Sequence, residues 1–152
     1  MFRRSRGAAG VAAVSAALAT AIGLPAPANP VVSVRIGNAS STFDLAYAAS
    51  ASSLGGFVTS ENAPLATIPH GTGDSYAVTS ASPRAIAGAL IYRVAGEPTR
   101  ECTFRYTLSY AGTKFVVTVD ARASWTGPVR CTAAASALER TKGDFTVTFT
   151  MQ

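Results

Sequence analysis

A strict alternation of apolar and polar residues in ECTFRYTLSY, positions 101–110, limits what this chain can fold into. Because successive side chains of a β-strand point to opposite faces, this period of two predicts a strand with one buried face. The segment DFTVTFTM near the C-terminal end repeats the pattern, with threonines on its polar face. The first segment places these side chains on its apolar face: Cys102, Phe104, Tyr106, Leu108 and Tyr110.

Further strands are expected wherever β-branched and aromatic residues lie between clusters of Gly, Pro, Asn and Ser. One segment, TAAASALERTK at 132–142, could form a helix of about two or three turns. A parallel sheet would need more helices than this one. The sequence therefore predicts an all-β fold, a single antiparallel β-sandwich of about eight short strands, with a barrel as the alternative. The further strand segments are 31–36, 42–48, 56–58, 75–80, 85–94, 113–121 and 124–131.

Residues 1–28 have the three parts of a secretory signal peptide. A basic head, MFRRSR, precedes an apolar run, and Ala26-Pro27-Ala28 supplies a cleavage site of small residues. A membrane anchor is the alternative, but the run is rich in Ala and Gly, and about 20 strongly apolar residues would be needed to span a bilayer. We therefore expect a secreted protein that is cleaved after Ala28, with residues 29–152 forming one β-sandwich domain.

The charge distribution counts against a nucleic-acid partner. The whole chain has a formal net charge of +5, but residues 29–152 carry ten Lys or Arg against eight Asp or Glu. Binding to nucleic acid requires clustered cations that displace counterions from phosphates, and these residues contain no basic run. We expect no nucleic-acid binding.

The two cysteines, Cys102 and Cys131, are expected to form a disulfide, because an even number of cysteines in an exported chain favours a bridge. Metal binding by the pair is the alternative. A structural zinc site uses four Cys or His ligands, and His70 is the only histidine of the chain. The sequence predicts one disulfide and no metal or other cofactor.

His70 lies in TIPHGTGDSYAV, between Pro69 and Gly71. Proline fixes one backbone dihedral and glycine accepts positive ones, so this segment predicts a surface turn. A Ser-His-Asp arrangement stays open because serines and aspartates are plentiful, but the sequence has no G-x-S-x-G motif. The carboxylates match no calcium loop, and no glycine-rich phosphate loop is present. We expect a binding protein rather than an enzyme, with a hydrolase as the least favoured alternative.

Four segments within residues 31–117 carry a resemblance to a known family: VVSVRIGNASSTFDLAYAAS, GGFVTSENAPLATIPHGTGDSYAV, AIAGALIYRV and CTFRYTLSYAGTKF. Together they resemble the aegerolysin and actinoporin-like group of secreted β-sandwich proteins. The resemblance implies a β-sandwich fold and recognition of lipid surfaces. The matching positions are Asn38 and Ser40, Ile68 to Gly71, Gly88-Ala89 with Tyr92, and Tyr110 with Gly112.

The chain departs from that group in three places. Ser109 precedes Tyr110, where the group usually has Pro before its lipid-facing tyrosine. The chain enters its first strand almost directly after Ala28, where actinoporins have an amphipathic helix. The tryptophan-rich membrane loop is reduced to Trp125. The resemblance therefore implies the fold more firmly than it implies pore formation.

Tyr110 and Trp125 are the candidate contacts with a lipid or a protein partner. Trp125 precedes Thr126-Gly127-Pro128, and an aromatic side chain at such a bend suits a membrane interface or a partner's pocket. The alternative for Trp125 is a core position over the disulfide, and Tyr110 shares the inward parity of Cys102, which favours burial. Two functions are carried forward: a secreted, non-enzymatic protein that binds lipid or membrane surfaces, or an exported protein-interaction or adhesion domain without membrane activity.

Overall fold

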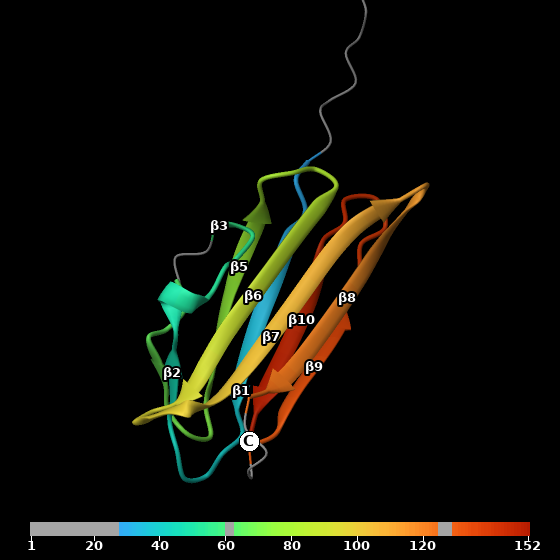
Figure 1. Cartoon of the computed structure of the whole chain (residues 1–152). Coiled ribbons are helices and arrows are strands. Elements are labelled where there is room, and N and C mark those ends of the chain that lie inside the picture. Colours follow the sequence, from blue (N-terminus) through green and yellow to red (C-terminus); the bar gives the residue numbers. More distant parts are fainter. Residues whose placement is uncertain (1–27, 60–62, 125–128) are drawn as a thin grey trace, which may run out of the picture.

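The computed structural model describes residues 28–59, 63–124 and 129–152. These residues form two five-stranded sheets that pack face to face, as Figure 1 shows. The predicted all-β sandwich is confirmed, although the described residues form ten strands rather than about eight. The elements are β1 (Val31–Asn38), β2 (Leu45–Tyr47), the 3-10 helix η1 (Ala49–Ala51), β3 (Gly56–Val58), β4 (Thr67–Ile68), β5 (Gly73–Ser80), β6 (Ala85–Val94), β7 (Glu97–Ala111), β8 (Lys114–Ala123), β9 (Cys131–Ser136) and β10 (Phe145–Met151).

One sheet has the strand order β3-β5-β1-β10-β9 and the other β4-β2-β6-β7-β8. Neighbouring strands are antiparallel as predicted, with one exception. β10 lies between β1 and β9 and runs parallel to β1, from Val32 opposite Phe145 to Asn38 opposite Met151. The antiparallel hairpin with β9 sets the direction of β10, so β10 meets the free edge of β1 in parallel.

The core lies between the sheets, where the alternating side chains of the strands meet. Phe104 of β7 stacks on Phe149 of β10 with ring centroids 4.8 Å apart, and both side chains are fully buried. The predicted disulfide is confirmed: Cys102 of β7 is bonded to Cys131 of β9, so it joins the two sheets covalently. Burial of the aromatic and aliphatic side chains between the sheets supplies the main driving force for the fold.

The segment 132–142 does not form the helix that its sequence allowed. Residues 131–136 form β9, and the chain then turns through 137–144 before β10. Pairing with β10 gives the backbone of this segment its hydrogen bonds, and Ala133 packs against the core. The helix propensity of its alanines is therefore overridden by tertiary contacts.

The strand expected at 124–131 is also corrected. Ser124 lies in a bend, residues 129–130 are outside any strand, and β9 begins at Cys131. Residues 125–128 and the expected signal peptide, up to residue 27, lie outside the described residues. Across the described ranges we find no helix with the length and apolar character needed to cross a bilayer.

Candidate functional site

Three connections meet at one end of the sandwich: residues 81–84 between β5 and β6, 112–113 between β7 and β8, and 137–144 between β9 and β10 (Figure 1). We call this the Tyr110 end. The opposite end, where residues 39–44 and 69–72 lie, we call the Asp44 end.

The ring of Tyr110 contacts two neighbouring side chains at this end of the sandwich. The Arg84 guanidinium carbon lies 5.2 Å from the centroid of the Tyr110 ring, and the Phe115 ring meets Tyr110 edge-on at 5.0 Å. Gly112, with φ +64°, makes the tight turn that places Tyr110 opposite Phe115. The site is thus an aromatic pair with a cation against it.

Tyr110 is 38% exposed, although its inward parity favours burial. Tyr106 already packs against Phe145, the first residue of β10. Tyr110 lies four residues further along β7 than Tyr106, so its side chain extends past the start of β10 in the opposite sheet. The expected burial is therefore wrong, and the exposed ring keeps Tyr110 available as a contact residue.

The loop at 137–144 closes against this aromatic pair. The backbone N–H of Gly143 donates to the carbonyl of Glu139, and that of Glu139 donates to the carbonyl of Asp144, both at 2.7 Å. Gly143 has φ +82°, and a side chain there would come within 3.1 Å of the Leu108 side chain and within 2.9 Å of the Phe115 ring. The loop backbone at Gly143 therefore lies close to Phe115 and leaves no room for a side chain there.

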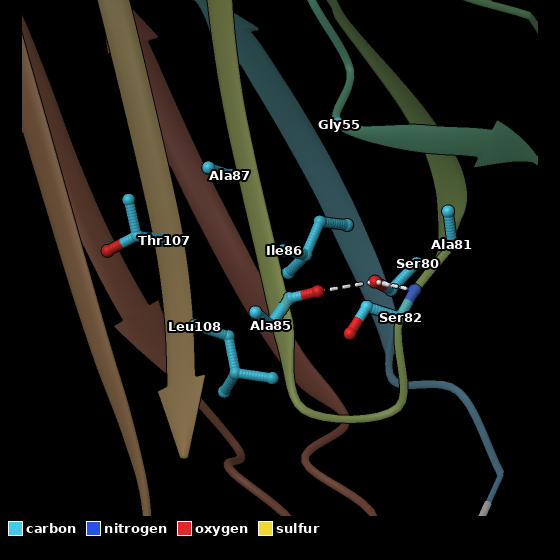
Figure 2. Close-up of a pocket in the computed structure, with 9 residues that line it drawn as sticks. All are labelled: Gly55, Ser80, Ala81, Ser82, Ala85, Ile86, Ala87, Thr107 and Leu108. Carbon is cyan, nitrogen blue, oxygen red and sulfur yellow. Dashed lines mark hydrogen bonds between the residues drawn. The ribbon is translucent and has the colours of Figure 1, made fainter. Parts of the chain in front are cut away.

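A small hollow is lined in part by residues that flank Arg84 in the sequence (Figure 2). Its volume is 250 Å³, below the roughly 300 to 1,000 Å³ of ordinary small-molecule sites. The Ser80 hydroxyl at its edge accepts from the backbone N–H of Ser82 and donates to the carbonyl of Ala85, so it is already satisfied. Size and lining suit a small apolar group at most. The lining residues are Gly55, Ser80, Ala81, Ser82, Ala85, Ile86, Ala87, Thr107 and Leu108.

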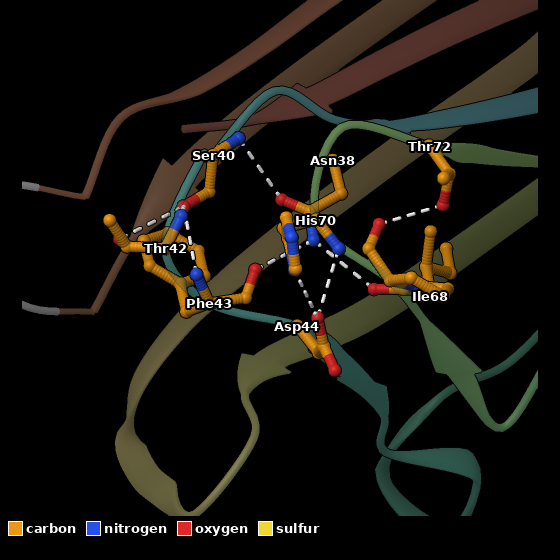
Figure 3. Close-up of polar contacts among 9 residues, drawn as sticks. Asn38, Ser40, Thr42, Phe43, Asp44, Ile68, His70 and Thr72 are labelled. Atoms are coloured by element: carbon orange, nitrogen blue, oxygen red, sulfur yellow. Dashed lines mark hydrogen bonds and ion pairs between the residues drawn. The ribbon is translucent and has the colours of Figure 1, made fainter.

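The Asp44 end is held together by polar contacts between its two loops (Figure 3). The buried Asn38 amide donates to the carbonyls of Phe43 and Ile68, and its oxygen accepts from the backbone N–H of Ser40. The Ser40 carbonyl accepts from the N–H of Gly71. The segment from Asn38 to Ser40 therefore has a structural role, because its hydrogen bonds join the two loops.

His70 lies in the predicted turn, followed by Gly71 with φ +69°. Its backbone N–H and its Nδ1 both contact Asp44 Oδ1, at 2.9 and 3.0 Å. These contacts, the backbone one first, hold the pKa of Asp44 below its usual value of 3.8. Within the described ranges, His70 contacts no serine or threonine hydroxyl, so a nucleophile for a catalytic triad is not assembled there.

A polar hollow of 410 Å³ opens beside these loops. Arg100 lies in it, bonded to both carboxylate oxygens of Glu97 at 3.1 and 2.9 Å, with its guanidinium 5.4 Å from the centroid of the Phe43 ring. Because Glu97 already neutralises the cation, the hollow offers a ligand little uncompensated charge. Its lining residues are Ala39, Ser40, Ser41, Thr42, Phe43, Glu97, Arg100 and Gln152.

The second candidate contact, Trp125, lies outside the described residues. The neighbouring Ser124 donates its backbone N–H to the carbonyl of Glu101, at the opposite end of β7 from Tyr110. The described part of the chain therefore does not bring the two predicted contacts together. It contains no group of three or more His, Cys, Asp or Glu that could hold a metal ion.

Sequence reasoning missed Arg84 and Phe115, which hold the tyrosine ring. Phe115 could have been found, because a hairpin closed at Gly112 places it opposite Tyr110. Arg84 follows Pro83 in a short connection and carries no local signal, since its approach to Tyr110 depends on the pairing of β6 with β7.

Comparison with known proteins shows the fold. No protein-family model matches the sequence, and no curated protein matches it either. The structure is similar to the crystal structure of the lipid binding protein Nakanori, with 14% sequence identity and a TM-score of 0.54 over 82% of this chain and 71% of that one. It is also similar to RahU, solved with a TRIS molecule, with 12% identity and a TM-score of 0.52 over 80% of this chain and 93% of that one. These likenesses support the aegerolysin-like β-sandwich resemblance as a likeness of fold.

Proposed function

We propose that this protein is an exported, non-enzymatic β-sandwich that binds a lipid surface through its Tyr110 end. The exposed Tyr110 ring, held between Arg84 and Phe115, is the observation that carries the proposal. A tyrosine has an apolar body and a polar tip, and such side chains favour the boundary between headgroups and acyl chains. A cation against the ring places a positive charge where headgroup phosphates lie.

The similarity of the fold to that of a lipid binding protein also supports this proposal. One structural neighbour is described as a lipid binding protein, and the sequence resembles a group whose members recognise lipid surfaces. A common fold by itself does not transfer function, so the site must carry the argument. The exposed aromatic side chain at a strand end provides that site.

Export is part of the proposal. Residues 1–28 form the signal peptide, cleavage follows Ala28, and the mature domain is 29–152. The disulfide between Cys102 and Cys131 supports an oxidising compartment. Intact-mass measurement of protein from the culture medium should give a chain that starts at Asn29, whereas full-length protein found only in the membrane fraction would contradict export.

Vesicle sedimentation tests lipid binding directly. The secreted protein is centrifuged with vesicles of phosphatidylcholine, of phosphatidylcholine with phosphatidylserine, and of phosphatidylcholine with sphingomyelin and sterol. Binding to at least one composition is expected, with release upon Tyr110→Ala. Protein that stays in the supernatant with every composition would rule out the proposal.

A protein-interaction domain is the second candidate, because Phe57 is 69% exposed on β3. β3 is an edge strand of its sheet, so its outer backbone groups can pair with a strand of another protein. Phe57→Ser should leave vesicle binding unchanged if the lipid proposal holds. Loss of a cell-surface or protein partner with Phe57→Ser, together with no vesicle binding, would favour this second function.

A further inference from the structure

The two ends of the sandwich differ in how their charges are arranged. At or near the Asp44 end, Arg93 pairs with Glu101 and Arg100 with Glu97, and the Nδ1 atom of His70 contacts the Asp44 carboxylate. At the Tyr110 end, four exposed cations form no ion pair with any residue that the structure describes. They are Arg84, Lys114, Arg140 and Lys142.

The contacts of the Tyr110 end bring these four cations around one aromatic pair. Arg84 stacks on Tyr110, and Lys114 precedes Phe115 in the hairpin. Lys142 precedes Gly143, where a side chain would come within 2.9 Å of the Phe115 ring, and Arg140 lies in the same loop. The cations therefore come from three connections that are far apart in the sequence.

Two carboxylates at this end are engaged elsewhere. Asp144 accepts from the backbone N–H of Val31 at 2.7 Å, and Glu139 accepts from the Thr141 hydroxyl at 2.9 Å. Neither forms an ion pair with one of the four cations. Four cations against two carboxylates leave this end with an excess of positive charge beside an exposed aromatic ring.

We infer that the lipid surface bound by the Tyr110 end is anionic, and that Arg140, Lys142, Lys114 and Arg84 contact its headgroup phosphates and carboxylates. This inference rests on the proposed function. Basic side chains at a membrane surface are attracted to anionic headgroups, and the attraction weakens as salt screens it. The tyrosine ring anchors at the interface, while the surrounding cations determine which membrane is chosen.

The test compares two double variants that lose equal charge. Arg140→Gln with Lys142→Gln removes two cations from the exposed loop and leaves the Arg84–Tyr110 contact intact. Arg35→Gln with Arg130→Gln is the control, because Arg35 lies on the outer face of β1 and the backbone of Arg130 pairs with that of Gln152, at the end of β10 opposite to the Tyr110 end. Each variant and the parent protein are sedimented with phosphatidylcholine vesicles and with vesicles that also contain phosphatidylserine, at low and at high salt.

We expect binding to the anionic vesicles that is lost at high salt. The loop variant should bind roughly 25-fold more weakly, at about fivefold per cation, and the control should bind like the parent. Equal, salt-insensitive binding to both vesicle types would overturn the inference while leaving the proposed function standing. Binding to neither type would overturn the inference, and it would overturn the proposed function as well only if the vesicles with sphingomyelin and sterol also failed to bind the protein. Equal weakening by the control, or binding to a heparin column without binding to vesicles, would also overturn the inference.

Discussion

The guanidinium of Arg84 stacks over the ring of Tyr110, with its central carbon 5.2 Å from the ring centroid. The pair joins the β5–β6 connection to the end of β7, and the exposed face of the tyrosine is thereby held in one orientation. A preorganised aromatic ring loses less conformational entropy when it binds than a mobile one. This contact makes Tyr110 the centre of the proposed site.

Replacing Tyr110 by Ala should therefore abolish vesicle binding with only a modest loss of stability. The ring is partly exposed, so losing its edge-on contact with Phe115 should cost about 0.5 to 1.5 kcal/mol of unfolding free energy. Tyr110→Phe keeps the ring and should retain most of the binding. Sedimentation and thermal unfolding of both variants provide the check, and an alanine variant that still binds would remove Tyr110 from the site.

The disulfide should contribute strongly to stability. Cys102 and Cys131 are separated by 29 positions, and closing such a loop stabilises the fold by about 3 to 4 kcal/mol through the entropy of the unfolded chain. Thiol labelling of the native protein should find no free sulfhydryl. Urea unfolding with and without reductant measures the effect, and two labelled thiols per chain would show that the bridge is absent.

The turn at His70 should tolerate change at one position and not at the next. His70→Asn keeps the backbone N–H contact with Asp44 and should change the unfolding free energy by less than about 0.5 kcal/mol, since substitutions of exposed side chains usually have small effects. Gly71→Val should cost more, about 1 to 2 kcal/mol, because φ is +69° there. Thermal unfolding of both variants measures which substitution lowers stability more. Loss of binding by His70→Asn at an unchanged melting temperature would instead make His70 a functional group.

Gly88 and Gly37 should respond differently to alanine, although both lie in strands. A side chain at Gly88 would collide with the ring and hydroxyl of Tyr106, whereas one at Gly37 meets nothing closer than 3.7 Å. Gly88→Ala should therefore displace Tyr106, break its 2.6 Å hydrogen bond to the carbonyl of Leu54, and cost about 1 to 3 kcal/mol. Gly37→Ala is the matched control and should be nearly neutral in denaturant unfolding. Equal effects would mean that Tyr106 can move away freely.

Stability should fall as the pH rises above the usual tyrosine pKa of 10.0. Burial raises the pKa of Tyr76, Tyr92 and Tyr106, so the unfolded chain ionises these phenols first and gains stability relative to the folded one. Below that pH the contribution is fully present. Melting temperatures across the alkaline range should decline less steeply for Tyr92→Phe, which removes one such phenol. An identical slope would mean that Tyr92 ionises in the folded state.

Local patterns in the sequence predicted the elements whose evidence is local. The alternation of β7 identified its buried face, and the segment expected at 113–121 corresponds to β8. Non-local pairings could not be read in this way: β10 beside β1, and β9 where alanines favoured a helix. Tyr110 shows the limit most clearly, because parity identifies which face of a strand a residue occupies, but not where the opposite sheet ends.

The central position of β10 determines when this domain can finish folding. β10 is the last of the described strands in the sequence, yet it lies between β1 and β9. A chain that emerges from a ribosome or an export channel with its N-terminus first keeps one edge of β1 unpaired until Phe145–Met151 have been released. Contacts this distant in sequence form slowly, so chaperones have time to hold the chain open. Truncation before β10 would remove the middle of a sheet, and proteases would meet an unfolded chain rather than a shortened domain.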